Sequence, residues 1–174
     1  MEARREGWNV VCEDESIVLY DSVVRAVWAK RGSRPFILTT GSHARTCLFG
    51  ALSMDKRHLF RQYERIDNVN FLKFLKEAKR KFGPFLLFLD KSSIHRSRNI
   101  KKWLDENKGS IQVIWFPTGC PELNLVEEGW RQTKDSVVAC VLHPSFAELK
   151  NTLSKYLRTN RFKLDLTKYL CRSL

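Results

Sequence analysis

Three acidic residues have the side-chain type and the positions that metal-dependent phosphate chemistry requires. Asp90 directly follows the all-apolar run Phe85–Leu89, where a buried strand is expected to end. Asp14 ends a shorter, mostly apolar run, and Glu127 follows a strand-like segment and its loop. Two Mg²⁺ ions held by carboxylates can activate a nucleophile and stabilise the leaving oxygen of a phosphoryl displacement. We therefore predict that Asp90 bridges two ions, with Asp14 and Glu127 binding them from either side.

Each of these acids also has a simpler interpretation. Asp14 stands between two other acids and could be one of several surface carboxylates. Glu127 could be an acid that the helix dipole favours at a helix start, and Glu122 or Glu128 could be mistaken for it. Asp90 is harder to explain in this way, because an acid directly after five buried residues usually has a partner or a metal.

The charge balance indicates a polyanionic partner. The chain has 31 Lys and Arg against 19 Asp and Glu, which gives a formal net charge of +12. This excess is typical of nucleic-acid-binding proteins, although a basic domain of a larger basic assembly would also have it. With no recognition helix evident, we expect salt-sensitive, largely nonspecific contacts with DNA phosphates. The residues predicted to make them are Lys30, Arg31, Arg34, Lys91, His95, Arg96, Arg98 and Lys134.

Two of these residues have competing roles. His95 could contact the scissile phosphate, lie near the metal ions, or cap the helix that follows it. Lys134 could contact a DNA phosphate or be an ordinary solvated lysine. The other histidines have no partner at metal-ligand spacing, so no function is assigned to them.

The cysteines and the apolar runs bound the class of protein. The five cysteines are widely spaced and form no C-x-x-C pair, which excludes a zinc ribbon and a thioredoxin-like motif. Cys12 and Cys47 lie in apolar segments and are expected to be small buried side chains. No apolar leader and no run of about 20 apolar residues is found, so we expect a soluble protein of the cytoplasm.

The hydrophobic pattern changes period along the chain. The first part predicts short strands at Val10–Cys12, Ile17–Tyr20, Phe36–Thr40, Thr46–Met54 and Leu59–Ile66. The second part predicts a helix at Asn68–Phe82, a strand at Phe85–Leu89, a helix at 97–108, a strand at Ile111–Phe116, and helices at 124–138 and from Ser145. This order predicts an α/β domain with a mixed sheet, antiparallel early and parallel late. A ligand site is expected at the carboxyl ends of the parallel strands, where Asp90 lies.

Four segments carry a resemblance to a known family. They are Val11–Ser16, Trp28–Gly32, Leu89–His95, and Pro121–Trp130 followed by Lys134. Together they resemble the motifs of the DDE transposases, in the bacterial insertion-sequence branch related to mariner elements. The likeness spans about residues 8–138, and the Pro-Glu-Leu-Asn segment is its most specific part.

The resemblance implies an RNase H-like fold and a catalytic triad of Asp14, Asp90 and Glu127. It also implies two Mg²⁺ or Mn²⁺ ions, DNA strand cleavage followed by strand transfer, and a homodimer assembled on transposon-end and target DNA in the nucleoid of a prokaryotic host. We expect residues 1–174 to form a single catalytic domain, with a core at 8–138 and a C-terminal helix and basic tail at 144–174. No helix-turn-helix domain is expected before it.

Two departures from the family pattern keep other functions open. Lys91 stands where the family usually has Asn beside the central aspartate, and Leu125 replaces a usual Pro. A cation at 91 could compete with a metal or contact a phosphate. The chain could thus be an active transposase domain, a catalytically inactive DNA-binding remnant, or a stand-alone RNase H-like nuclease.

Overall fold

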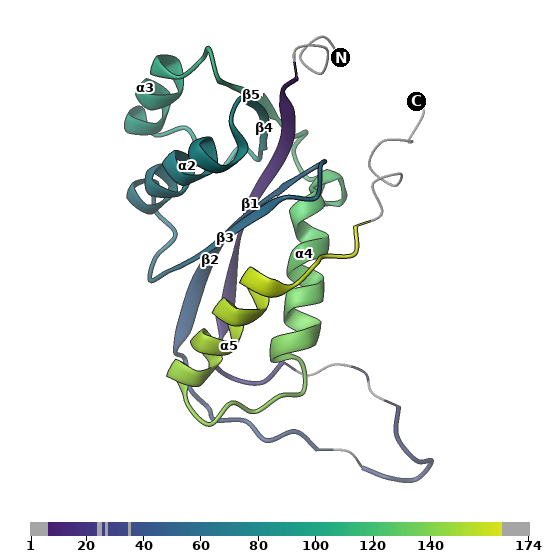
Figure 1. Ribbon diagram of the computed structural model, residues 1–174. Helices are drawn as coiled ribbons and strands as arrows, with labels where there is room; N and C mark the ends of the chain where they lie inside the picture. Colours follow the sequence, from purple (N-terminus) through teal and green to yellow (C-terminus); the bar gives the residue numbers. More distant parts are fainter. Residues whose placement is uncertain (1–6, 24–25, 27, 35, 165–174) are drawn as a thin grey trace.

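A five-stranded sheet forms the centre of the molecule (Figure 1). The computed structural model describes residues 7–23, 26, 28–34 and 36–164. The strands are β1 (Asn9–Leu19), β2 (Arg45–Ser53), β3 (His58–Tyr63), β4 (Phe85–Leu89) and β5 (Ile111–Trp115). Their order in the sheet is β3-β2-β1-β4-β5. β1, the longest strand, therefore lies in the middle.

The pairing of the strands confirms the predicted mixed sheet. β1 pairs antiparallel with β2, and β2 pairs antiparallel with β3. On its other side β1 runs parallel to β4, which runs parallel to β5. β1 therefore joins an antiparallel half to a parallel half, and the parallel half brings strand ends together at one edge.

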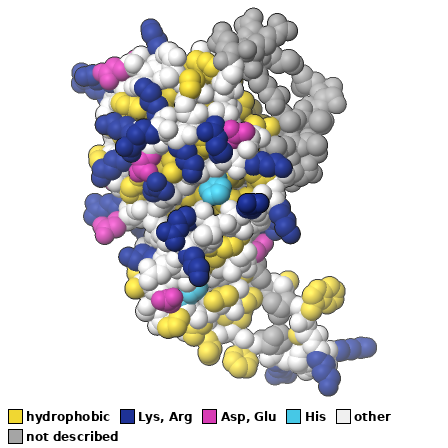
Figure 2. Space-filling model, viewed as in Figure 1, with side chains coloured by type: hydrophobic (Ala, Val, Ile, Leu, Met, Phe, Trp, Pro, Cys, Tyr) yellow, Lys and Arg dark blue, Asp and Glu magenta, His cyan; other side chains and the backbone are white. Residues whose placement is uncertain are grey.

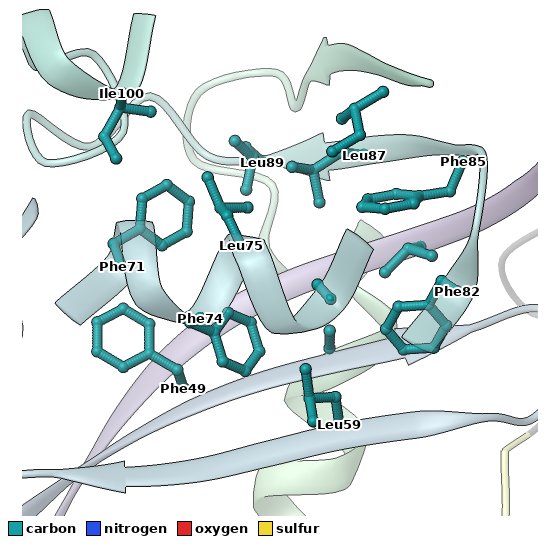
Figure 3. Close-up of a cluster of buried hydrophobic side chains, with 14 residues drawn as sticks. Phe49, Leu59, Phe71, Phe74, Leu75, Phe82, Phe85, Leu87, Leu89 and Ile100 are labelled. Carbon is teal, nitrogen blue, oxygen red and sulfur yellow. The ribbon is translucent and has the colours of Figure 1, made fainter. Parts of the chain in front are cut away.

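One face of the sheet, called here the α2 face, is covered by α2 (Asn68–Phe82) and α3 (Arg98–Glu106). Figure 3 shows Phe71, Phe74 and Leu75 of α2 packed against strand side chains such as Phe49 and Leu87. These side chains are fully buried. Each contributes about 1.5–3 kcal/mol to folding, so this cluster fixes α2 on the sheet.

The opposite face, called here the α4 face, is covered by α4 and α5 (Figure 1). The elements on this side are the 3₁₀ turn η1 (Pro121–Leu123), α4 (Leu125–Thr133), the π-helical segment η2 (Lys134–Val138) and α5 (Phe146–Thr159). Leu48 of β2 and Phe60 of β3 pack in the same apolar cluster as Trp130 of α4. Helices on both faces complete a three-layer α/β/α arrangement.

Capping side chains stabilise the starts of two helices. The Asp67 carboxylate accepts from the backbone N–H of Asn70 at 2.8 Å, and the Ser145 hydroxyl accepts from that of Glu148 at 3.1 Å. Gly83, with φ of 72°, ends α2 directly after Phe82, the predicted last residue of the helix. Among the described residues, none of the helices is both long enough and apolar enough to cross a bilayer.

The two predicted cysteine environments are confirmed. Cys12 and Cys47 are both buried and free. Burial raises the pKa of the Cys12 thiol to about 11. At neutral pH this thiol stays protonated, as expected for a small side chain of the core.

Two strand predictions were wrong. Val10–Cys12 and Ile17–Tyr20 were predicted as separate strands, but one continuous strand runs through the acids between them, because β2 and β4 both pair with it. Phe36–Thr40 was predicted as a strand, yet its described residues form none. That stretch belongs to the 20–44 segment, whose described residues 28–34 and 36–40 extend away from the sheet (Figure 1). Asp21 shapes the segment by accepting from the backbone N–H groups of Thr40 and Gly41.

Candidate active site

The three consecutive acids of β1 point to alternating faces of the sheet. Asp14 faces α4, where its Oδ2 accepts from the indole N–H of Trp130 at 3.0 Å. Glu13 and Glu15 face the other way, toward His95 on the α2 face. Asp14 was predicted at a strand end, but it lies in the middle of β1. Asp14 is directed away from its acidic neighbours because successive side chains along a strand point to opposite faces of the sheet. A position at the end of the strand is not the cause.

The parallel pairing of β1 and β4 brings Asp14 toward Asp90. The last pair of that ladder joins Cys12 to Phe88, so two further residues place Asp14 beside Asp90. Both line a cavity of about 430 Å³, and Glu127 lines the same cavity. The structure thus brings the three predicted acids to one site, although they are separated by 76 and 37 positions in the sequence.

Asn124 sets the position of Glu127. Its side-chain N–H₂ donates to the carbonyl oxygen of Glu13 at 3.1 Å, and its side-chain oxygen accepts from the N–H of Val126 at 3.1 Å. The first bond ties the start of α4 to β1, and the second caps the helix. Glu127, in the first turn, is therefore held close to the strand that carries Asp14.

Trp130 and Gly50 form the support of Asp14. Gly50 is the β2 residue paired with Asp14. A Cβ at position 50 would lie 2.7 Å from the Trp130 ring and 2.5 Å from the Phe60 ring. Only a glycine therefore leaves room for the indole that donates to Asp14.

The surroundings of Asp14 disfavour its negative charge. Burial, and after it the negative charge of Glu127, raise the pKa of Asp14 to about 7, although the hydrogen bond from Trp130 acts in the opposite direction. Two carboxylates that repel one another in a cleft are stabilised together by a cation. The arrangement is therefore suited to binding a metal ion.

Asp90 contacts both the cavity and the buried residues beneath it. Its side chain is 56% exposed. Its Oδ1 accepts from the backbone N–H of Ser92 at 2.9 Å and lies 2.8 Å from Nδ1 of His95. Because these contacts engage Oδ1, the orientation of the Asp90 carboxylate is fixed while Asp90 still lines the cavity.

His95 lies below the site, on the buried side of β1, so its predicted contact with DNA would require the side chain to become exposed. The side chain is only 1% exposed, and its ring lies 4.4 Å from that of Phe71, between centroids. Its Nε2 lies 2.9 Å from Oε1 of Glu15. Burial lowers the pKa of His95, but the hydrogen bond and charge of Glu15 outweigh it, so the pKa is raised overall. The Ser97 position, not His95, precedes α3.

Glu13 is the most enclosed acid of the group. Its side chain has no exposed surface, and neither carboxylate oxygen has a hydrogen-bond partner. Burial first, and then the charges of Glu15, Asp14 and Asp90, raise its pKa well above the usual range. Glu13 therefore belongs to a second cluster, with Glu15 and His95, behind the strand.

The chemistry of Asp14, Asp90 and Glu127 fits Mg²⁺ or Mn²⁺. All three offer only carboxylate oxygens, which these ions prefer, and the cavity is open to the water molecules that such ions retain. Their ligand atoms do not all lie within 4.8 Å of one another. One ion bound by all three acids would therefore require their side chains to move.

The other predicted DNA contacts differ in their distance from the cavity. Lys91 lines it directly. Arg96, just before α3, and Arg98, its first residue, are exposed, and Lys134 is half-buried at the start of η2. The remaining three predicted residues, Lys30, Arg31 and Arg34, are exposed on the 20–44 segment. Residues 165–174 of the predicted basic tail lie outside the described residues.

The surface of the molecule is basic over a wide area. Figure 2 shows that Lys and Arg side chains outnumber Asp and Glu side chains on the face that carries α2, α3 and β3. A surface of this kind attracts a polyanion by long-range electrostatics. The predicted contacts at Arg96 and Arg98 lie next to α3 on the same part of the molecule.

Sequence reasoning missed the buried partners of the triad. Gly50 interrupts a strand of large residues, which is a sign of a close backbone approach. Glu13 and Glu15 flank Asp14 at a spacing of two, and this spacing places both on one face of a strand. Treating residues 9–19 as one strand would therefore have placed them opposite Asp14.

Comparison with known proteins agrees with this geometry. Residues 9–150 match the sequence model of a family described as DDE superfamily endonuclease. An insertion element IS630 uncharacterized 39 kDa protein of Shigella sonnei is 29% identical over 132 residues, covering 74% of this chain and 38% of the relative. The chain therefore spans well under half of that relative's length.

Solved structures show the same fold. The mariner Mos1 paired end complex with Mg matches with a TM-score of 0.70 and 12% identity, over 97% of this chain and 54% of that one. The HTLV-2 integrase catalytic core domain in complex with magnesium matches with a TM-score of 0.59 and 13% identity, over 86% of this chain and 82% of that one. These likenesses confirm the predicted RNase H-like fold.

Proposed function

Because the chain belongs to the DDE superfamily endonuclease family, we propose that it cleaves DNA strands with divalent metal ions and then transfers the freed ends to target DNA. Asp14, Asp90 and Glu127 are the proposed catalytic triad. The observation that carries the proposal is the cavity that all three line. Residues 1–174 are proposed to act as one catalytic domain of the transposase type.

The proposed roles of the site residues are to bind metal ions and to position the metal-binding carboxylates. Asp14, Asp90 and Glu127 would together hold the proposed Mg²⁺ or Mn²⁺ ions through their carboxylate oxygens. Bound ions supply the charge that activates a nucleophile and stabilises the leaving oxygen. Trp130 orients Asp14 through its 3.0 Å hydrogen bond, and Asn124 holds α4, and with it Glu127, against β1.

The proposed substrates are transposon-end DNA and target DNA. The net charge of +12 supports a polyanionic partner. The relatives support the same substrate, since Mos1 was solved as a paired-end complex with a transposon end and as a strand transfer complex. Bringing two ends together requires two active sites, so a homodimer on DNA is proposed as the acting form.

Nicking of supercoiled plasmid at low salt tests the proposal. Wild-type protein with Mg²⁺ or Mn²⁺ is expected to convert supercoiled plasmid to the open circle, and Asp90→Ala is expected not to. Asp105→Ala, which removes an exposed acid of α3, is the matched control and should nick like wild type. Metal-dependent nicking that persists in Asp90→Ala would refute the proposed triad.

One observation favours a second candidate, a catalytically inactive DNA-binding remnant. Lys91 lines the triad cavity, where its ammonium group competes with metal ions for the carboxylates. Under this alternative, wild-type protein binds DNA in a salt-sensitive manner but does not nick it. Lys91→Asn decides between the two: nicking that appears only in this variant identifies a remnant, whereas nicking by wild type excludes one.

A further inference from the structure

We propose that Glu13, Glu15 and His95 form a second metal site, buried on the α2 face of β1, which takes one divalent first-row transition ion. This site is distinct from the proposed triad, because alternation along β1 directs Asp14 to the α4 face. The inference does not depend on the proposed function. It rests on geometry, on an unpartnered buried carboxylate and on the orientation of the histidine.

The three side chains are close enough to share one ion. One ligand atom from each, His95 Nε2 among them, lies within 4.8 Å of the others. Nε2 is 2.9 Å from Oε1 of Glu15 and 3.6 Å from Oε2 of Glu13. Neighbouring ligands of a tetrahedral ion with bonds of about 2.0–2.1 Å lie about 3.3 Å apart. The two separations bracket that spacing, so small side-chain rotations suffice.

Glu13 supplies the observation that points to a ligand. Its side chain is fully buried, and both carboxylate oxygens lack any hydrogen-bond partner. A buried carboxylate without a hydrogen-bond partner is costly, and the His95 Nε2 atom, at 3.6 Å from Oε2, is too distant to supply one. Both oxygens of Glu13 are free to bind, so Glu13, Glu15 and His95 offer four donor atoms to one ion.

Asp90 orients the histidine for coordination. Nδ1 of His95 lies 2.8 Å from Oδ1 of Asp90 and 3.1 Å from its carbonyl oxygen, so it can donate to Asp90 while a metal ion takes the place of the proton that Nε2 shares with Glu15. Nε2 then faces the two glutamates as the metal-binding nitrogen. A histidine that donates from one ring nitrogen to a carboxylate while the other binds metal is the usual second-sphere arrangement.

The donor set selects the kind of ion. One imidazole nitrogen with carboxylate oxygens suits Zn²⁺ or Mn²⁺, whereas Mg²⁺ prefers oxygen ligands and retains its water. The enclosure favours an ion held by protein atoms alone, since His95 and Glu13 are 1% and 0% exposed. Such an ion would connect β1 to the loop after β4 that presents Asp90.

Metal retention by the 174-residue chain tests the site. Protein stripped with a chelator is reloaded with Zn²⁺, desalted and analysed for metal content, with affinity measured by titration calorimetry. Wild type is expected to retain one Zn²⁺. The double variant Asp14→Asn/Glu127→Gln, which removes two triad ligands, should retain it as well, whereas Glu13→Gln should bind at least about 100-fold more weakly. The exposed α3 acid Glu106, changed to Gln, is the control.

Two results would overturn the inference. They are the absence of retained Zn²⁺ in the double variant, and unchanged retention in Glu13→Gln. Nicking assays on the same preparations separate this inference from the proposed function, because the double variant should have lost nicking while it keeps its Zn²⁺.

A spectroscopic measurement avoids any dependence on the folding of Glu13→Gln. Zinc X-ray absorption of the loaded double variant is expected to show one imidazole nitrogen, with oxygen as the other ligands, at about 2.0–2.1 Å. A triad site would contribute no imidazole at all. A spectrum with oxygen alone, with sulfur, or with two or more imidazoles would refute the site.

Discussion

Asp14 and its neighbours Glu13 and Glu15 follow one another on β1, yet their side chains meet opposite surroundings. On the α4 face, Asp14 lines an open cavity with two other carboxylates. On the α2 face, Glu13 is sealed from solvent beside His95. The first arrangement is suited to ions that keep water and exchange with substrate, and the second to an ion or proton that stays in place.

The comparison teaches that residue type alone does not assign a role to an acid in this chain. Both faces raise the pKa of a carboxyl group, first through burial and then through neighbouring negative charges. What separates them is access, since Asp90 is 56% exposed and His95 only 1%. The difference in exposure supports the proposal that catalysis takes place on the α4 face, where the cavity is open to solvent.

The largest expected effect lies in the cavity of the α4 face. Changing Glu127 to Gln removes one carboxylate charge from the proposed metal site while keeping the size of the side chain. Metal ions contribute several kcal/mol to such transition states, so nicking should fall on the order of 1,000-fold. Rates of plasmid nicking measure this. Glu122→Gln, on the adjacent η1 turn but not among the cavity residues, is the control, and an equal loss there would break the comparison.

The next effect concerns stability and pH. The pKa of Asp14 is raised from 3.8 to about 7, so its ionisation destabilises the fold, and stability is lost as the pH rises between these values. In metal-free protein, Asp14→Asn should therefore gain about 2–4 kcal/mol over wild type between pH 4 and pH 8. Urea unfolding at both pH values measures the difference.

Metal ions should reverse the difference in stability between Asp14→Asn and wild type. At pH 8, Mn²⁺ should stabilise wild type more than Asp14→Asn, because the ion binds the ionised carboxylate. The account of Asp14 would be contradicted by a difference in unfolding free energy that does not change with pH. Equal stabilisation of both proteins by Mn²⁺ would also contradict it.

A smaller effect is expected at the support of Asp14. Gly50→Ala places a methyl group against the Trp130 and Phe60 rings and should cost about 1–3 kcal/mol of unfolding free energy. It should also reduce nicking, because the indole can no longer keep its bond to Asp14. Gly109→Ala, where no atom lies within 4 Å of the added methyl group, is the control for both measurements. Full nicking activity in Gly50→Ala would show that nicking does not depend on the hydrogen bond from Trp130 to Asp14.

The smallest effect is expected away from both faces, on the 20–44 segment. Changing Lys30, Arg31 and Arg34 together to Gln removes three exposed charges. If all three contact phosphates, the slope of log affinity against log salt should decrease in magnitude by about 2.7. Fluorescence anisotropy with a DNA duplex at several salt concentrations measures the slope. An unchanged slope would place the DNA elsewhere on the molecule.

Much of the fold could be predicted because local signals agreed with tertiary structure. The helix Asn68–Phe82 was predicted at the residues where it occurs, since its apolar period, its Asp67 cap and its Gly83 end all point the same way. The strand Phe85–Leu89 was equally clear, being apolar on both faces as a central strand is. Both elements interact mainly through the core that Figure 3 shows.

The strand predictions were wrong where pairing with other strands, and not the local sequence, decides the structure. The charged residues within 9–19 look like a break between strands, but β2 and β4 pair with β1 and impose one strand. Phe36–Thr40 has strand-forming residues but no partner strand in the described structure. The buried role of His95 was also hidden, because Glu15 lies 80 positions away in the sequence.

Site-directed oxidative cleavage by bound iron is the measurement that tests the two-face account most directly. Fe²⁺ in the metal sites, with ascorbate and peroxide, cuts the backbone close to the ion, and the fragments are mapped by mass spectrometry. We predict a cut near Glu127 that excess Mg²⁺ suppresses and that is lost in Asp14→Asn, together with cuts near Glu13 and His95, from Fe²⁺ in the α2-face site, that excess Mg²⁺ does not suppress. An ion confined to the α2 face would cut near Glu13 and His95 only. Absence of the Glu127 cut in wild type would contradict a metal site on the α4 face.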